Sequence, residues 1–252
     1  MRNFVKAILV GALALPLAAQ AQISTTKHNL GSTGSGSVKT SATAEICIFC
    51  HTPHNASTTK ALWNHTLSVS GYSWDDGSGS TKTSQGTTLP TTQAQFSING
   101  SGRCLSCHDG TVSVGNVMNY QASATTFSGF TAYTNRVTAA GNIDVNSRYA
   151  VGESSNLSKN HPVGIPFAGQ TGGAPVGMNN YYGVNTASCT TQSGGGCVNN
   201  ATNGYGLPLY LKGAVYQIEC ATCHEPHGAG NNNQFLRVAN TGSALCLTCH
   251  QK

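Results

Sequence analysis

Charged residues are scarce in this chain of 252 residues. Asp, Glu, Lys and Arg together make up 8% of the sequence, whereas about a quarter of an ordinary globular protein is charged. The formal net charge is +5, and the basic residues do not gather into a cluster. The sequence therefore lacks the basic patch that nucleic-acid binding requires, and we expect no nucleic-acid partner.

Apolar residues are also too few for a conventional core. Hydrophobic residues account for 38% of the sequence and aromatic residues for 7%, while 30 glycines and many Ser, Thr and Asn residues fill other positions. A chain of this composition buries little apolar surface when it folds. No helical periodicity extends beyond about ten residues. We therefore expect a mostly irregular fold with few short helices and strands.

The first 21 residues have the features of a secretory signal peptide. Arg2 and Lys6 precede an apolar run, and Ala19-Gln20-Ala21 fits the cleavage pattern. The run is too short to span a bilayer, and no other segment is apolar enough, so we expect no membrane span after cleavage. The mature protein is expected to be secreted or to lie at the extracellular surface, with the periplasm as the alternative.

Eight of the ten cysteines occur in four copies of a Cys-x-x-Cys-His pattern. Two thiols at this spacing can each form a thioether with a haem vinyl group, and the next residue then ligates the iron as the proximal His. A zinc ribbon also pairs Cys-x-x-Cys segments, but it does not require the His, and four copies favour haem. We predict four covalently attached c-type haems. The attachment residues are Cys47, Cys50, Cys104, Cys107, Cys220, Cys223, Cys246 and Cys249, and the proximal ligands are His51, His108, His224 and His250.

The four motifs form two copies of one dihaem unit. Each copy opens with Cys-x-x-Cys-His-x-Pro-His and closes with Cys-Leu-x-Cys-His. We place the first unit at 22–108, with its motifs at 47–51 and 104–108, and the second at 220–252. The fold is thus expected to wrap around four haems, which supply the apolar interior that the chain lacks.

The segment 109–219 connects the two units and is rich in Gly, Ser and Asn. Its two remaining cysteines, Cys189 and Cys197, flank a Gly-rich loop in an oxidising compartment, so we predict a disulfide between them. Brief strands are expected at Thr111–Val117 and Ala214–Ile218. Short helical turns are expected around 99–108 and 241–250.

The number of non-motif histidines nearly equals the number of second axial ligands that four haem irons need. Five histidines remain after the proximal ligands are assigned, and the only methionine alternatives in the mature chain are Met118 and Met178. Ligation by two histidines at every haem, with one to spare, is the simplest interpretation. The candidate distal ligands are His28, His54, His65, His161 and His227.

His227 follows His224 by three residues, a span of at most roughly 10 Å, so it cannot reach the opposite face of the same iron. We expect His227 to ligate the haem at 246–250. By the repeat, His54 should ligate the haem at 104–108.

The haems at 47–51 and 220–224 would then take their second ligands from the other three histidines. The sequence does not determine which of the three is spare. A histidine could also be passed to a haem of a neighbouring subunit. The arm bearing His28, or the exposed His54, could do this.

An ordered set of short motifs carries a family resemblance over roughly residues 27–252. The set is Lys-His-Asn-Leu, Cys-His-Thr-Pro-His-Asn, Leu-Trp-Asn-His, Cys-Leu-Ser-Cys-His-Asp-Gly, Asn-His-Pro-Val, Cys-His-Glu-Pro-His and Leu-Cys-Leu-Thr-Cys-His. It resembles small secreted tetrahaem cytochromes of metal-respiring bacteria, including the OmcE-type cytochromes that polymerise into extracellular electron-conducting filaments. The resemblance implies a line of stacked haems, a homopolymer, and a histidine that ligates a haem in the next subunit.

Electron transfer is the predicted function, because two axial imidazoles leave no open iron position for a substrate. We expect no enzymatic activity. The expected partners are redox proteins or extracellular electron acceptors, together with further copies of the chain. One alternative is a soluble periplasmic tetrahaem shuttle. A second, from a different class, is a haem reductase of the nitrite or hydroxylamine type, which needs one five-coordinate haem.

Overall fold

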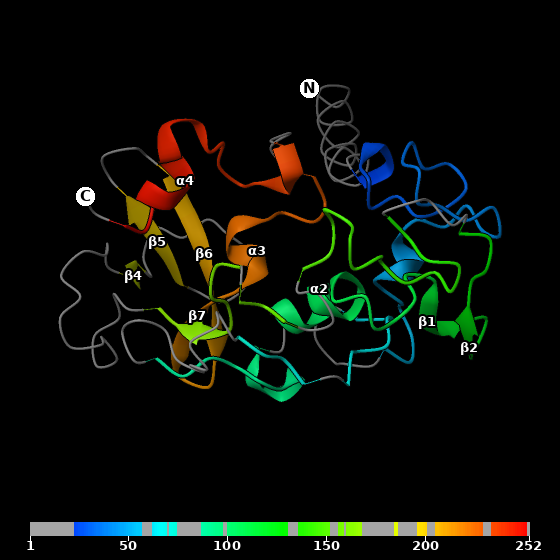
Figure 1. Cartoon of the computed structure of the whole chain (residues 1–252), viewed down its shortest axis with the longest axis horizontal. Helices are drawn as coiled ribbons and strands as arrows, with labels where there is room; N and C mark the ends of the chain where they lie inside the picture. The colour runs from blue at the N-terminus through cyan, green and yellow to red at the C-terminus, as the bar shows by residue number, and fades with distance from the viewer. Residues whose placement is uncertain are drawn as a thin grey trace, which may run out of the picture.

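The computed structural model consists mostly of loops that connect short helices and two small sheets (Figure 1). This confirms the fold expected from the composition. The structure describes residues 23–56, 62–69, 71–74, 87–97, 100–130, 136–151, 156–158, 160–167, 184–185, 196–200, 205–228 and 233–250. The predicted signal peptide, 1–21, lies outside these ranges. Within them, no helix has the length and apolar character needed to cross a membrane.

The helices are short, and the haem motifs lie on them. The predicted turns around 99–108 and 241–250 are confirmed by α2 and by η6 with α4. The helices of the described chain are η2 (Ile23–Thr25), η3 (Cys47–Phe49), η4 (Gln93–Gln95), α2 (Ser101–His108), α3 (Cys220–Cys223), η5 (Asn233–Phe235), η6 (Thr241–Ser243) and α4 (Ala244–Leu247).

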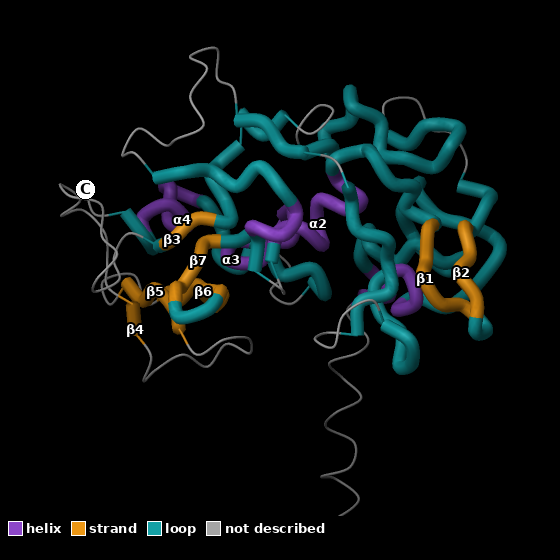
Figure 2. Tube along the Cα trace, turned by 90° about the horizontal axis from the view of Figure 1, so that it is seen from below, coloured by secondary structure: helices purple, strands orange, loops and turns teal. Residues whose placement is uncertain are grey.

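The two sheets lie at opposite ends of the molecule, with α2 and α3 between them (Figures 1 and 2). One is the antiparallel hairpin of β1 and β2. The other is a five-stranded antiparallel sheet with the order β3-β7-β6-β5-β4. The strands are β1 (Asn116–Tyr120), β2 (Ser123–Thr126), β3 (Ile165–Pro166), β4 (Val184–Asn185), β5 (Gly196–Asn200), β6 (Tyr205–Lys212) and β7 (Val215–Ile218).

The strand predictions are only partly right. The run Ala214–Ile218 corresponds to β7, which follows β6 through a two-residue turn with Gly213 at φ +61°. The strand predicted at Thr111–Val117 is mostly wrong, because the chain turns after Ser113 and β1 begins only at Asn116.

The buried apolar side chains form three separate clusters, and each lies against haem-motif residues. The first surrounds the β1–β2 hairpin and contacts Cys50 and Cys107. The second includes Leu105 of α2. The third, on the five-stranded sheet, contacts Cys249. The cluster members are Phe49, Val114, Val117, Phe127, Phe130, Val137 and Ile143; Tyr72, Trp74, Leu89, Phe96, Leu105 and Leu157; and Phe167, Val198 and Leu209.

The predicted disulfide involves β5, an interior strand of the larger sheet. Cys197 lies on β5, is buried and is disulfide-bonded. Its predicted partner, Cys189, lies outside the described residues, so the pairing stays a prediction.

Asn64 joins three segments that surround the first haem motif. Its side chain is fully buried, and its amide donates to the carbonyl oxygens of Ile48, at 2.7 Å, and Asn119, at 3.0 Å. Its Oδ1 accepts the Asn119 N–H at 2.8 Å. This one side chain therefore satisfies three backbone groups that water does not reach.

Replacing Asn64 with Ala should lower the free energy of unfolding of the holoprotein by about 3 kcal/mol, because buried backbone groups lose their partners. Denaturant titration followed by far-ultraviolet circular dichroism measures this change. Asn146, which is exposed and hydrogen-bonds to Asp144, gives the matched control Asn146→Ala, with an expected change below about 0.5 kcal/mol. Equal losses in the two variants would contradict the assigned role of Asn64.

Candidate functional site

Each Cys-x-x-Cys-His motif folds into a turn of helix. The third and fourth motifs lie on α3 and α4, the first on η3, and the second ends α2. One helical turn places the two cysteines on the same face and the His next to the first of them. In three motifs the N–H of the His donates to the carbonyl oxygen of the first Cys, at 2.7 Å for His51 and Cys47, 3.0 Å for His224 and Cys220, and 2.9 Å for His250 and Cys246.

Backbone carbonyl groups fix the proton position of two motif histidines. Nδ1 of His108 lies 2.6 Å from the Tyr149 carbonyl oxygen, and Nδ1 of His224 lies 2.8 Å from that of Gln234. A carbonyl oxygen can only accept, so Nδ1 carries the proton and Nε2 keeps the lone pair that a metal needs. Burial lowers the pKa of His108, which favours the neutral, ligating form. These turns therefore fit covalent haem attachment with a proximal His.

A second imidazole lies against three of the four motif histidines. The ring centres of His51 and His227 are 6.1 Å apart, and their planes differ by 18°. The other two pairs are His28 with His108, at 6.2 Å and 62°, and His161 with His250, at 6.5 Å and 70°.

These separations fit two ligands on opposite sides of one metal. A metal–imidazole bond is about 2 Å long and the ring centre lies roughly 1 Å further, so opposite ligands have ring centres about 6 Å apart. Ordinary aromatic contacts also have ring centres about 4.5–7 Å apart, so the three distances are compatible both with a shared metal and with direct ring contact. Each of the three pairs is therefore a candidate for the two axial ligands of one iron.

The non-motif histidines of these pairs also have an acceptor at Nδ1. His28 contacts the Pro226 carbonyl oxygen at 3.1 Å, and His161 contacts that of Pro162 at 2.9 Å. The His28 ring also stacks on Phe235, with ring centres 4.5 Å apart. Burial is the main cause that lowers the pKa of His28 to about 4, so this imidazole is neutral and can ligate through Nε2.

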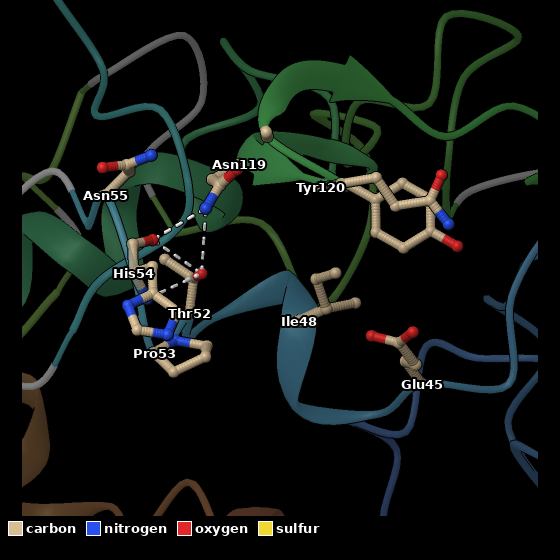
Figure 3. A pocket seen from close by; sticks show the side chains of 10 residues that line it. Glu45, Ile48, Thr52, Pro53, His54, Asn55, Asn119 and Tyr120 are labelled. Atoms are coloured by element: carbon tan, nitrogen blue, oxygen red, sulfur yellow. Dashed lines mark hydrogen bonds between the residues drawn. The ribbon is translucent and has the colours of Figure 1, made fainter.

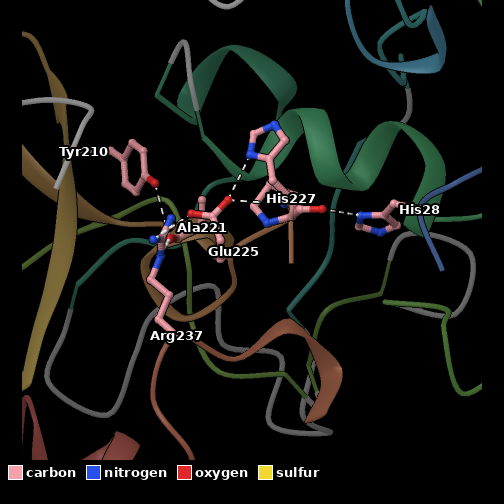
Figure 4. A network of polar contacts seen from close by, with 7 residues as sticks. His28, Tyr210, Ala221, Glu225, His227 and Arg237 are labelled. Atoms are coloured by element: carbon pink, nitrogen blue, oxygen red, sulfur yellow. Dashed lines mark hydrogen bonds and ion pairs between the residues drawn. The ribbon is translucent and has the colours of Figure 1, made fainter. Parts of the chain in front are cut away.

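His227 has a charged acceptor instead of a carbonyl group (Figure 4). Its Nδ1 lies 2.9 Å from Glu225 Oε1, and the other Glu225 oxygen pairs with Arg237 at 2.8 Å. The hydrogen bond from His227 lowers the pKa of Glu225 to about 2. A carboxylate behind a ligating imidazole fixes the ring and makes its other nitrogen more basic.

The observed pairs differ from the pairs expected from the repeat. The ring of His227 lies against that of His51, and the ring of His28 against that of His108. The repeat instead assigned His227 to the haem at 246–250 and His54 to the haem at 104–108. The repeat identifies equivalent residues, but it carries no information on how the two copies pack. Glu219 ties α3 to α2 through Ser101, and the second unit therefore lies against the first.

His65 is placed by the backbone. It is fully buried; its Nδ1 lies 2.9 Å from the Thr66 carbonyl oxygen and its Nε2 lies 3.0 Å from that of Ser113. Burial lowers its pKa. Nε2 also lies 3.3 Å from Cys107 Sγ, so His65 borders the second haem motif, and both of its nitrogens already have partners within the chain.

His54 and His224 are the two histidines of the set that remain, and both are exposed. His54 lies at the edge of an open cavity of ≈ 360 Å³ between η3 and the β1–β2 hairpin, lined also by Pro53, Tyr120 and Gln121 (Figure 3). Among the residues that the structure describes, neither His54 nor His224 has a second imidazole against its ring.

Neighbouring thiols connect the four motifs in chain order. Burial, followed by the charge of Cys107, raises the pKa of Cys50 to about 12. Because Cys107 must lie near Cys50 to have this effect, the first motif lies beside the second. Cys104 and Cys220 form a thiol–thiol hydrogen bond that joins the second to the third. Burial, followed by the charges of Cys220 and Cys246, raises the pKa of Cys223 to about 11, so the third lies beside the fourth.

A zinc ribbon would bring four cysteines around one point. Within the described ranges, no group of three or more His, Cys, Asp or Glu side chains is arranged to hold a metal ion directly.

Comparison with known proteins identifies the C-terminal part of the chain. Residues 213–252 match the family model described as the doubled CXXCH motif. No curated protein matches the chain. The matched segment contains the third and fourth motifs, and the same five-residue pattern occurs at 47–51 and 104–108. The doubled motif and its two further copies make this chain a multihaem c-type cytochrome.

Proposed function

We propose that this cytochrome carries electrons outside the cytoplasm through four haems, each ligated by two histidines. The observation that carries the proposal is the set of three imidazole pairs with ring centres 6.1–6.5 Å apart. Each pair joins a motif histidine to a histidine from another part of the chain. A bound haem would supply one-electron oxidation and reduction.

The residues of the chain determine what such a haem can do. Two imidazoles occupy both axial positions and leave no site for a substrate, so we propose electron transfer without catalysis. The acceptors at Nδ1 of His28, His108, His161, His224 and His227 hold each proton on the nitrogen that faces away from the metal. The contacts between neighbouring motifs support a continuous row of four haems along which electrons move.

The repeat suggests how the fourth iron acquires its second ligand. His227 of the second unit lies against His51 of the first, and His54 is the equivalent of His227 in the first unit. If the same contact is repeated between subunits, His54 of one subunit ligates the iron held by His224 of the next. A head-to-tail contact of this kind does not close and generates a filament. His65 is then the spare histidine.

Because His224 is exposed, an enzymatic function, that of a haem reductase, is the alternative from a different class. Without a ligand from a second subunit, an iron at this position would be five-coordinate, as a haem reductase of the nitrite or hydroxylamine type requires. A soluble periplasmic shuttle would carry the same haems without the contact between subunits. Carbon monoxide binding and the state of assembly separate these alternatives from a conducting filament.

The oxidised protein should give two kinds of low-spin electron paramagnetic resonance spectrum. Parallel imidazole planes split the iron d orbitals along one axis, whereas crossed planes largely cancel each other. The near-parallel pair at 18° should give a rhombic spectrum, and the pairs at 62° and 70° a strongly anisotropic one. A single rhombic component for all haems would contradict the assigned pairs.

Replacing His161 with Ala should open one iron position, because His161 is the ring that lies against His250. About one quarter of the haem should then bind carbon monoxide after reduction, measured as a change in the Soret absorption band. The control His65→Gln removes the histidine that we consider spare and should add no binding. Carbon monoxide binding by the His65 variant alone would reverse the two assignments.

Replacing His54 with Ala should prevent polymerisation and leave one haem per chain open to carbon monoxide. Negative-stain imaging and sedimentation measure the assembly, and the exposed neighbour gives the control Asn55→Gly, which should still polymerise. A monodisperse monomer of the native protein would end the filament proposal. Native filaments that persist unchanged in the His54 variant would show that another residue makes the contact.

A further inference from the structure

Glu219 is a fully buried carboxylate that immediately precedes the third haem motif. One oxygen accepts the Ser97 N–H at 2.8 Å. The other accepts the Ser101 N–H at 2.8 Å and the Ser101 hydroxyl at 2.6 Å. A Cβ on Gly100 would lie 2.4 Å from the Glu219 side chain. The absence of a side chain at position 100 therefore makes room for the carboxylate.

This carboxylate joins the attachment segments of two haems. Ser101 is the first residue of α2, which carries Cys104 and His108, and Ser97 comes four residues before it. Glu219 leads directly into α3. The Cys220 N–H donates to the Ser101 hydroxyl at 2.9 Å, so Ser101 bonds to both sides of the junction. The Cys104 and Cys220 thiols also contact each other there.

The contacts of Glu219 are those of an ionised carboxylate. Every described partner of its two oxygens is a donor, whereas a protonated carboxyl group would need an acceptor for its own proton. Because the Ser101 hydroxyl accepts from Cys220, its own proton points to Glu219. The ion pairs of the described residues involve Glu225 and not Glu219.

The negative charge of Glu219 acts on both attachment points. It contributes to the raised pKa of Cys104, after the hydrogen bond with Cys220, burial and the charge of Cys220. It also opposes the lowered pKa of Cys220, which the hydrogen bond with Cys104 causes. A charge that disfavours a thiolate at these positions equally favours additional positive charge there.

We propose that Glu219 is a positioning residue that locks the second and third haem segments together and lowers the reduction potentials of the haems attached at 104–108 and 220–224. An oxidised iron carries one more positive charge than a reduced iron, so a buried carboxylate beside it stabilises the oxidised state. The inference rests on the proposed electron-transfer function. Glu219 would then set the reduction potentials of the two middle haems in the row of four.

Cations near this junction oppose Glu219 but do not change the sign of its effect. Arg103 is buried in α2 beside Cys104, and its pKa is lowered by burial. Lys212 lies close enough for Glu219 to act on it electrostatically. Asp109, which is buried at the end of α2, adds a second negative charge. All three remain in a Glu219 variant, so the change measured there belongs to Glu219.

The test is a spectroelectrochemical titration of the purified holoprotein. Glu219→Gln keeps the shape and removes the charge, and Glu45→Gln removes an exposed charge of the same sign as the matched control. We expect at most two of four haem transitions to move to higher potential in the Glu219 variant, and none to move in the control. The absorption spectrum should stay low-spin in both variants. A variant with disrupted structure would instead lose axial ligands and show high-spin haem.

The outcomes separate this inference from the proposed function. Native protein without low-spin haems would end the proposed function, whereas low-spin haems with potentials unchanged in Glu219→Gln, or shifted equally at all four haems, would overturn only the role of Glu219.

If Glu219→Gln yields no holoprotein, Ser101→Ala decides the matter, because it removes a donor that offsets the charge and keeps the charge itself. The same transitions should then move to lower potential. No movement, or a movement to higher potential, would overturn the inference.

Discussion

A separation of about 6 Å between imidazole rings from distant parts of the chain is the constraint on which the rest of this structure depends. His28 comes from the N-terminal arm, His161 from the connecting segment and His227 from the second unit. Each of them lies against a motif histidine from a different part of the chain. A haem bound at each pair would be fixed by two thioethers and two ligands. Segments separated by up to about 180 residues would then be held by coordination bonds.

This constraint explains how so polar a chain can fold. The apolar side chains form three separate clusters instead of one core, and each cluster lies against haem-motif residues. Between them the chain runs in loops that a conventional hydrophobic core does not usually support. Flat apolar haems held at the motifs would supply the missing interior, so we expect folding of the protein to be coupled to haem attachment.

The sequence was sufficient for the local features and insufficient for the long-range ones. The haem turns at 101–108 and 241–247 could be predicted because the motif itself requires a helical turn. The longest strand, β6, was missed because it contains Pro208 opposite Cys197 in an interior position, where proline normally argues against a strand. The histidine pairs could not be predicted from the repeat, because they depend on how α3 lies against α2.

The junction between α2 and α3 could not be found from motifs either. Glu219 reads as an ordinary acid before a Cys-x-x-Cys-His pattern, and its role depends on Ser97, Gly100 and Ser101 more than a hundred residues earlier. The closeness of the two units also means that the boundaries at 108 and 220 separate stretches of sequence that hydrogen-bond to each other, because the Cys220 N–H donates to the Ser101 hydroxyl.

The most direct test of this account is an experimental density map of the native holoprotein. We predict an iron between His51 and His227, another between His28 and His108, and a third between His161 and His250. We also predict that the iron at His224 is ligated by a histidine from a neighbouring subunit. A map in which the irons lie outside these three imidazole pairs would contradict the central claim.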